Sequence, residues 1–168
     1  MSLNGLKKYI SQCRSQVTRK SLAEQIRMDI EYKINEPITS GQFVGVLERS
    51  GLAERRPVHN SECMEGVVKN SNLVVSAWDG DELIGIARSV TDFHYACYLS
   101  DLAVDQKYQT NGVGKKLIAL TQEQLNEECK LILLAAPDAN SYYEHLGFEN
   151  NSRCWVLDRG RSVECNIK

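Results

Sequence analysis

The sequence predicts an α/β fold of the α+β type, in which a mixed sheet combines an antiparallel meander with one strand-helix-strand crossover and has helices on both faces. Residues 73–104 hold three apolar runs joined by short turns, which is the pattern of a meander. Residues 109–126 hold a glycine turn followed by an amphipathic helix. Residues 130–136 are wholly apolar, as expected for a parallel strand that is buried on both faces after a helical crossover.

Local signals set the expected elements before the crossover. Residues 30–34 alternate between apolar and polar side chains and predict a first strand. Thr39 is a suitable cap for a helix that ends at Gly51, and Asn60 is a suitable cap for a second helix. The dipeptide Asp79-Gly80 predicts a tight hairpin. The meander strands are then expected at residues 73–78, 83–90 and 95–104.

Two further elements are expected after the apolar run at 130–136. Pro137 stops that strand, and residues 139–146 predict a short helix that Gly147 closes. Residues 155–157 predict a final strand.

Composition limits the classes of function. A length of 168 residues, with 42% hydrophobic and 25% charged residues, is typical of a single globular domain. No apolar run approaches the ~20 residues of a membrane-spanning helix. The net charge of −2 argues against nucleic acid as the main partner. We therefore expect neither a membrane nor a nucleic acid as the partner.

The first 28 residues differ from the rest in charge. They carry six Lys or Arg residues against one Glu, and apolar residues recur every three or four positions, which predicts a basic amphipathic helix. A mitochondrial transit peptide has a similar composition, but a solvated or docked extension of the domain is the simpler interpretation. Six cysteines without a C-x-x-C pair favour reduced thiols, a cytoplasmic location and no metal site.

Residues 98–118 carry the most informative pattern. A strand ends at Leu102-Ala103-Val104, a polar turn leads to Gln109-Thr110-Asn111-Gly112-Val113-Gly114, and a helix begins there. Glycines let the backbone approach a ligand closely, and the first N–H groups of a helix have no partner within it. This arrangement favours a bound phosphate, although a tight turn that only packs the helix on the strand has the same pattern. A Walker A loop would need Gly at 109 and Ser or Thr at 116, so this loop is excluded. A dinucleotide fingerprint would need Gly at 117, where this chain has Leu117, so it is a weak match.

The pattern Gln109-x-x-Gly112-x-Gly114 resembles motif A of the GNAT superfamily of N-acetyltransferases, whose loop holds the pyrophosphate of acetyl-CoA. A second segment, Ala139-x-x-x-Tyr143-x-x-x-Gly147-Phe148, is similar to a pattern that GNAT proteins commonly carry after the crossover. The resemblance covers residues 30–158. It predicts an N-acetyltransferase domain at 29–160, preceded by the extension at 1–28 and followed by a tail at 161–168.

The resemblance implies acetyl transfer from acetyl-CoA to a primary amine, directly within a ternary complex. It places the pantetheine arm against backbone groups of Leu102 and Val104, and a donor to the reacting oxygen at Leu102 or Ala103. It places the pyrophosphate against the loop, with Lys107, Lys115 or Lys116 able to add charge. The residues implied in cofactor binding are Leu102, Ala103, Val104, Gln109, Thr110, Asn111, Gly112, Val113, Gly114, Lys115 and Asn140. Asn140 departs from the family pattern, in which an Asn directly follows the apolar strand where this chain has Ala136.

The resemblance also suggests catalytic roles. Tyr143 is the candidate acid that protonates the leaving thiolate of CoA, while Tyr142 is the more natural core tyrosine. The base that removes the proton of the amine is not evident, and a water chain that ends on Asp101 or Tyr98 is our hypothesis for it.

The acceptor is expected to be a small-molecule amine, with aryl-alkyl amines as the narrower match. A protein or peptide amine is an alternative acceptor. The missing base also keeps open a non-catalytic sensor that binds acyl-CoA. The basic N-terminal helix and the last hairpin are candidate contacts of a homodimer.

Overall fold

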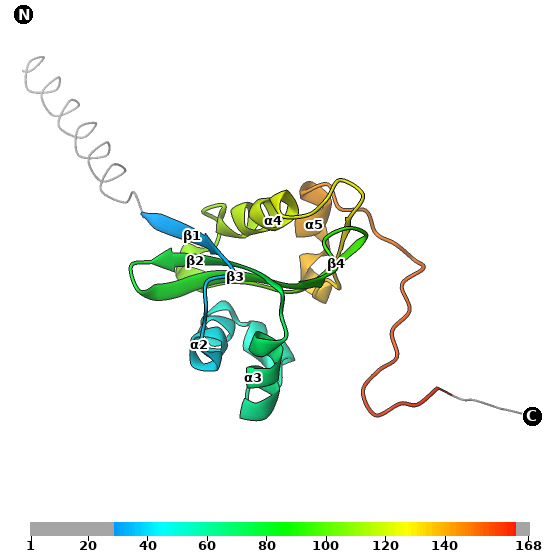
Figure 1. Ribbon diagram of the computed structural model, residues 1–168, viewed down its shortest axis with the longest axis horizontal. Coiled ribbons are helices and arrows are strands. Elements are labelled where there is room, and N and C mark those ends of the chain that lie inside the picture. The colour runs from blue at the N-terminus through cyan, green and yellow to red at the C-terminus, as the bar shows by residue number, and fades with distance from the viewer. Residues whose placement is uncertain (1–28, 164–168) are drawn as a thin grey trace, which may run out of the picture. The chain divides into compact units, whose positions relative to one another are not determined.

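The computed structural model describes residues 29–163 (Figure 1). These residues divide between Leu133 and Leu134 into two compact units. The first unit holds one five-stranded sheet in the order β1-β2-β3-β4-β5. Its strands are β1 (Ile30–Ile34), β2 (Leu73–Asp79), β3 (Glu82–Thr91), β4 (Ala96–Val104) and β5 (Lys130–Ile132). Strands β1 to β4 pair antiparallel and β5 pairs parallel to β4, which confirms the predicted mixed sheet.

Helices cover both faces of this sheet (Figure 1). One face carries α2 (Ser40–Ser50), the 3-10 turn η1 (Leu52–Arg55) and α3 (Ser61–Lys69). The other face carries α4 (Val113–Glu123), which follows the 3-10 turn η2 (Gln106–Tyr108). The second unit holds η3 (Pro137–Ala139) and α5 (Asn140–His145). No helix among residues 29–163 is long and apolar enough to cross a membrane.

The apolar periodicity of the helices accounts for the packing on each face. Phe43, Val46 and Leu47 of α2 are fully buried in one core cluster with Ile86 and Ala103 of the sheet. On the opposite face, Val113 and Leu117 of α4 lie over Gly85, where an added Cβ would come within 3.2 Å of both side chains. The glycine at position 85 therefore allows α4 to approach β3 closely.

The predicted helix caps are confirmed. The Thr39 hydroxyl accepts a hydrogen bond from the Gln42 N–H at 3.1 Å, and the Gln42 side chain accepts one from the Thr39 N–H at 2.9 Å. This reciprocal pair is a capping box. Gly51 ends α2 at φ 82°, and the Asn60 side chain caps α3 by accepting from the Cys63 N–H at 2.9 Å.

Thr39→Ala is expected to lower the free energy of unfolding by about 1 kcal/mol, because it removes the acceptor of the cap. Urea unfolding of the variant measures this loss. Thr39→Ser keeps the acceptor and is the matched control. A loss in Thr39→Ser equal to that in Thr39→Ala would contradict a role of the hydroxyl.

Two predictions about the chain after α4 were wrong. The apolar run at 130–136 forms a strand only over β5, and the side chain of Ile132 is 46% exposed rather than buried. This strand pairs with β4 at three positions only, and Ile132 is the last residue of the run that has a strand partner in the described residues. The strand expected at 155–157 is absent from the described residues, and Trp155 there is 93% exposed. Three consecutive apolar residues predict a strand only where another strand offers a partner.

The predicted extension at residues 1–28 lies outside the described residues. The domain boundaries at 29 and 160 therefore stay predictions.

Candidate functional site

The edge of β4 is open along most of its length. β4 pairs with β5 only from Ala96, opposite Lys130, to Tyr98, opposite Ile132. Beyond Tyr98 the two strands no longer pair, so the edge that β4 presents there has no partner strand in the described residues.

The backbone direction shows which groups lie along this open edge. The Asp105 N–H donates to the Ile84 carbonyl at 2.8 Å, so Asp105 faces β3. Backbone polar groups alternate between the two edges of a strand, and those of Val104 and Leu102 therefore point away from β3. The Gln109 amide donates to the Val104 carbonyl at 2.9 Å, which agrees with this direction. Leu102 and Val104, two residues of the predicted site, thus share the open edge.

The glycine loop follows directly from this edge. Thr110 and Gly112 adopt positive φ values of 67° and 79°, and α4 begins at the next residue, Val113. The first hydrogen bond of the helix runs from the Lys116 N–H to the Gly112 carbonyl at 3.0 Å. The N–H groups of the three residues before Lys116 therefore precede the hydrogen-bond ladder.

Several features of this end of α4 favour the binding of an anion. It has no side-chain cap and no acidic residue in its first turn, while Lys115 and Lys116 lie in that turn. The positive charge of these two lysines lies at the positive end of the helix dipole, and this repulsion is unfavourable unless an anion is bound there. An added Cβ at Gly112 would meet nothing within 4 Å, so the space in front of the loop is open.

Two contacts fix the segment that leads into the loop. Asp105 is buried and accepts from the Lys107 N–H at 2.9 Å and from Nε of Arg49 at 2.8 Å. The Tyr108 hydroxyl donates to the Asp79 carboxylate at 2.6 Å, which ties the segment to the β2–β3 hairpin. The loop is thereby anchored to α2 and to the sheet.

Tyr108 is expected to make stability depend on pH in alkaline solution. The hydrogen bond to the Asp79 carboxylate raises the pKa of Tyr108 from 10.0 to about 12. Above pH 10.0 the folded protein holds a proton that the unfolded chain releases, so stability falls as pH rises toward about 12. The difference in urea midpoint between the wild type and Tyr108→Phe should shrink across this range. A difference that stays constant would contradict the coupling.

A cluster of three charged side chains lies on the α2–α3 face of β4, and we call Arg56, Arg88 and Asp101 the arginine clamp. Asp101 is 2% exposed. One of its carboxylate oxygens accepts from Nε of Arg56 and the other from Nε of Arg88, each at 2.5 Å. Arg88 is itself buried and lies 5.8 Å from the ring centroid of Phe43. Both arginines thus have the same carboxylate as their partner.

The clamp holds a β-bulge in β4. Arg88 pairs with Asp101 and Ser89 pairs with Leu99, so Ser100 is an extra residue in β4. Both arginines bind Ser100 as well: Nη2 of Arg88 donates to the Ser100 hydroxyl at 2.5 Å, and Nη2 of Arg56 donates to the Ser100 carbonyl at 2.9 Å. The bulge begins the stretch of β4 that continues to Leu102 and the open edge.

The contacts of Asp101 in the clamp argue against the hypothesis that this carboxylate accepts the proton of the amine. Both oxygens of Asp101 are already engaged by guanidinium groups, so this geometry favours a positioning role over that of a proton acceptor. Tyr98 lies two residues before the bulge and is 39% exposed.

The sequence did not identify Arg56 or Arg88 as residues of the site. Arg88 stood inside an apolar strand, and a charged residue in such a place requires a buried partner.

The second unit carries the two remaining residues of the predicted site. Tyr143 of α5 packs edge-on against Tyr142 and Phe148, with ring centroids 5.3 and 5.6 Å away. Burial, and secondarily the neighbouring Tyr142, raises the pKa of the Tyr143 phenol. Asn140 begins α5 and is exposed. Among residues 29–163 no group of three His, Cys, Asp or Glu side chains is arranged to hold a metal ion.

Comparison with known proteins identifies the family. The model of the acetyltransferase (GNAT) domain matches residues 6–156, which is most of the chain. The chain belongs to the GNAT acetyltransferase family. The resemblance found in the sequence is thereby confirmed.

Relatives and solved structures agree with this assignment. GCN5-related N-acetyltransferase 2, chloroplastic, of Arabidopsis thaliana is 32% identical over a match that covers 66% of this chain and only 52% of the relative's length. A GNAT family acetyltransferase from Streptococcus pneumoniae has the same fold, with a TM-score of 0.61, 22% identity, and coverage of 76% of this chain and 98% of that chain. The aminoglycoside N-acetyltransferase AAC(6')-Iy, in complex with CoA, gives a TM-score of 0.59 at 17% identity, covering 79% and 95%.

The GNAT protein thus spans about half the length of this curated relative. The cytoplasmic location and the homodimer stay predictions.

Proposed function

We propose that this GNAT protein transfers the acetyl group of acetyl-CoA to a primary amine of a small molecule, with both substrates bound together. The observation that carries the proposal is the open edge of β4, which leads through the glycine loop into the uncapped end of α4. A structural neighbour that acetylates aminoglycosides and was solved with CoA supports the small-molecule acceptor.

The residues present fit acetyl-CoA. Free N–H groups at the start of α4, together with Lys115, suit a pyrophosphate, and the open space at Gly112 allows it to come close. The backbone groups of Leu102 and Val104 along the open edge suit the amides of a pantetheine arm. In this proposal the loop residues Gln109 to Gly114 hold the phosphates, and Asn140 is a further candidate contact.

When bound, acetyl-CoA supplies a thioester whose carbonyl carbon the amine nitrogen attacks. The new N–C bond replaces the C–S bond, the nitrogen loses one proton, and the sulfur leaves with the electron pair and takes up a proton. The Leu102 N–H is our candidate donor to the acetyl oxygen, because the Ala103 N–H points toward β3 by the same alternation. Tyr143 is our candidate donor of the proton to sulfur.

An alkyl amine has a pKa of about 10.4 and must be neutral to attack. With Asp101 engaged by the clamp, we propose that the amine loses its proton to water beside Tyr98 rather than to a carboxylate. Turnover should then rise with pH over the range in which the bound amine becomes neutral.

The proposal is tested by thiol release from acetyl-CoA against a panel of aryl-alkyl amines, polyamines, amino sugars and short peptides. Calorimetry with CoA accompanies the assay. Turnover on small amines is the expected result. Turnover on peptides alone would replace the small-molecule acceptor, and a wild type that binds no CoA would overturn the proposal.

Gly112→Val is expected to weaken CoA binding at least tenfold. A β-branched residue at a φ of 79° costs roughly 1–2 kcal/mol and turns the neighbouring N–H groups away from the phosphates. Gly160→Val is the matched control, because Gly160 has a φ of 76° and also has nothing within 4 Å of an added Cβ. Equal CoA affinity in both variants would contradict the assignment of the loop.

A further inference from the structure

The arginine clamp carries more positive charge than its own carboxylate can balance. Arg56 and Arg88 share Asp101, and among the described residues no other carboxylate pairs with either guanidinium. The clamp therefore has a net charge of one positive. It lies at Ser100, directly before the open edge at which the proposed acetyl transfer occurs.

Arg56 is the member of the clamp that a ligand can reach. Its side chain is 28% exposed, whereas that of Arg88 is 8% exposed. A guanidinium has five N–H donors. Arg56 directs one to Asp101, one to the Ser100 carbonyl and one to the Arg55 carbonyl at 3.0 Å. Two N–H donors are left without an acceptor in the described residues, and a carboxylate is their natural partner.

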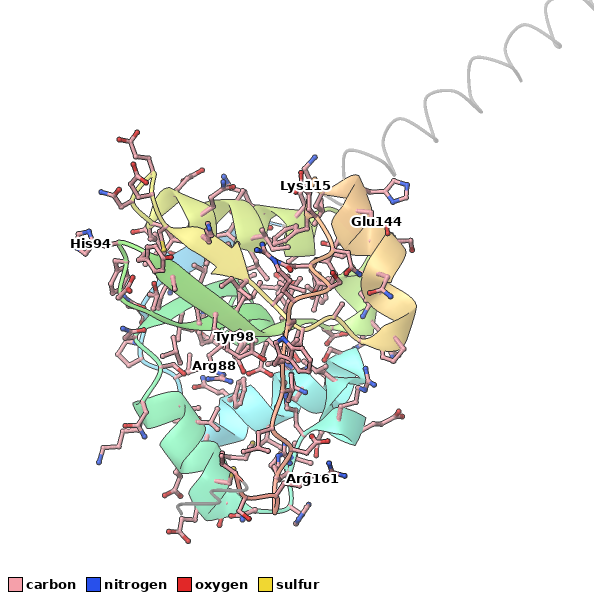
Figure 2. All side chains as sticks on the ribbon, turned by 90° about the vertical axis from the view of Figure 1, so that its right-hand side faces the viewer. Arg88, His94, Tyr98, Lys115, Glu144 and Arg161 are labelled. Carbon is pink, nitrogen blue, oxygen red and sulfur yellow. The ribbon has the colours of Figure 1, made fainter. Side chains whose placement is uncertain are left out.

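An apolar strip lies beside the clamp on the same face of the sheet. Val90 lies two residues after Arg88 in β3, so both side chains point to one face. Tyr98 pairs with Val90 on one side and with Ile132 on the other. Val90 is 49% exposed, Tyr98 is 39% exposed and Ile132 is 46% exposed. Figure 2 shows Tyr98 and Arg88 in the same part of the sheet. This strip suits an apolar or aromatic group.

The distance along β4 from the arginine clamp to Leu102 relates the clamp to the site of the proposed acetyl transfer. Ser100 lies two residues before Leu102, roughly 7 Å along a strand. In an α-amino acid the amine nitrogen and a carboxylate oxygen are roughly 3 Å apart. A nitrogen placed near the Leu102 N–H for acetyl transfer can therefore have its own carboxylate within reach of the long Arg56 side chain.

We propose that the acceptor is an amine that carries a carboxylate on the adjacent carbon together with an apolar or aromatic side chain, as in an amino acid. Arg56 binds the carboxylate, and the strip of Val90, Tyr98 and Ile132 contacts the side chain. The inference rests on the proposed function and leaves its covalent step unchanged. Tyr98 thereby acts in acceptor recognition.

Matched amines with and without the carboxylate test this class. The full chain is assayed for thiol release with phenylalanine against phenethylamine, and with tyrosine against tyramine. The carboxylate-bearing member of each pair is expected to have a kcat/KM at least tenfold higher, as a charge-assisted bidentate contact allows. Equal or higher kcat/KM for the amine without a carboxylate overturns the inference and leaves the proposed function standing.

Arg56→Gln separates recognition from folding, because Asp101 keeps Arg88 as its partner in this variant. The variant is expected to lose most of the tenfold preference, measured as the ratio of kcat/KM for phenylalanine to kcat/KM for phenethylamine in the same preparation, through a higher KM for phenylalanine. Arg55→Gln, at an exposed neighbouring arginine, is the control and should keep the preference. A preference that survives Arg56→Gln overturns the role of Arg56.

Equilibrium binding keeps the inference testable if no amine in the assay turns over. Calorimetry on the protein saturated with CoA should show phenylalanine binding at least tenfold more tightly than phenethylamine, which supports the inference even without turnover. Equal binding of the two compounds overturns it. CoA binding without turnover of any amine contradicts the proposed function, so the two failures are distinguishable.

Discussion

Tyr143→Phe is expected to leave CoA affinity nearly unchanged and to lower kcat by a factor on the order of 10² or more, the usual size of a general-acid contribution. The substitution removes one hydroxyl and keeps the ring. Edge-on packing against Tyr142 and Phe148 involves only that ring, so it should survive. The variant therefore separates the proton donor from the core side chain.

The environment of Tyr143 suits a donor. Burial raises the pKa of the phenol above its ordinary value of 10.0, so the proton stays on the oxygen at neutral pH. The loss of activity caused by ionisation of Tyr143 should accordingly appear only above pH 10.0, on the alkaline side of the pH–rate profile. In Tyr143→Phe this alkaline limb should disappear from whatever activity is left.

Tyr142→Phe is the matched control for this prediction. Tyr142 is the adjacent tyrosine on α5 and is 40% exposed, so its variant should keep wild-type turnover. Equal turnover of the wild type and Tyr143→Phe would make Tyr143 a packing residue. A wild type that binds CoA but acetylates no amine would instead favour the sensor hypothesis.

Features determined by a few adjacent residues could be predicted from the sequence. The capping box at Thr39, the left-handed Gly51 and the hairpin at Asp79-Gly80 depend on contacts within four residues, and the structure contains all three. The glycine loop belongs to the same group, because its free N–H groups follow from the position at which α4 begins.

Features that depend on distant contacts could not be predicted. Arg56 and Asp101 are 45 residues apart in sequence, and no periodicity relates them. Simple alternation along β4 also fails at Ser100, where the bulge adds one residue. The role of Asp101 could not be predicted from its position in the strand either, because its partners are Arg56, at the end of η1, and Arg88, in β3.

Asp101→Asn is expected to be the most destabilising single substitution in the candidate site, with a loss of roughly 3 kcal/mol in the free energy of unfolding. Breaking a buried ion pair by removing one partner usually costs about 3–5 kcal/mol, because the remaining charge stays buried without compensation. Here two guanidinium groups would lose their carboxylate at once. Arg56 is 28% exposed and regains some solvation, which places the expected loss near the lower end of the range.

Urea unfolding should show this loss as a midpoint about 1–2 M lower, for a slope typical of a small domain. Asp81→Asn, at an exposed carboxylate in the β2–β3 hairpin, should leave the midpoint unchanged.

The same unfolding measurement, combined with the turnover assay, also decides between two roles for Asp101. A general base that becomes an amide would abolish turnover in a protein of wild-type stability, whereas a member of the clamp would lose stability first. The double variant Asp101→Asn with Arg56→Gln removes one of the two orphaned charges, so it should be more stable than Asp101→Asn alone. That recovery would assign the cost to unbalanced guanidinium charge rather than to the altered shape of residue 101.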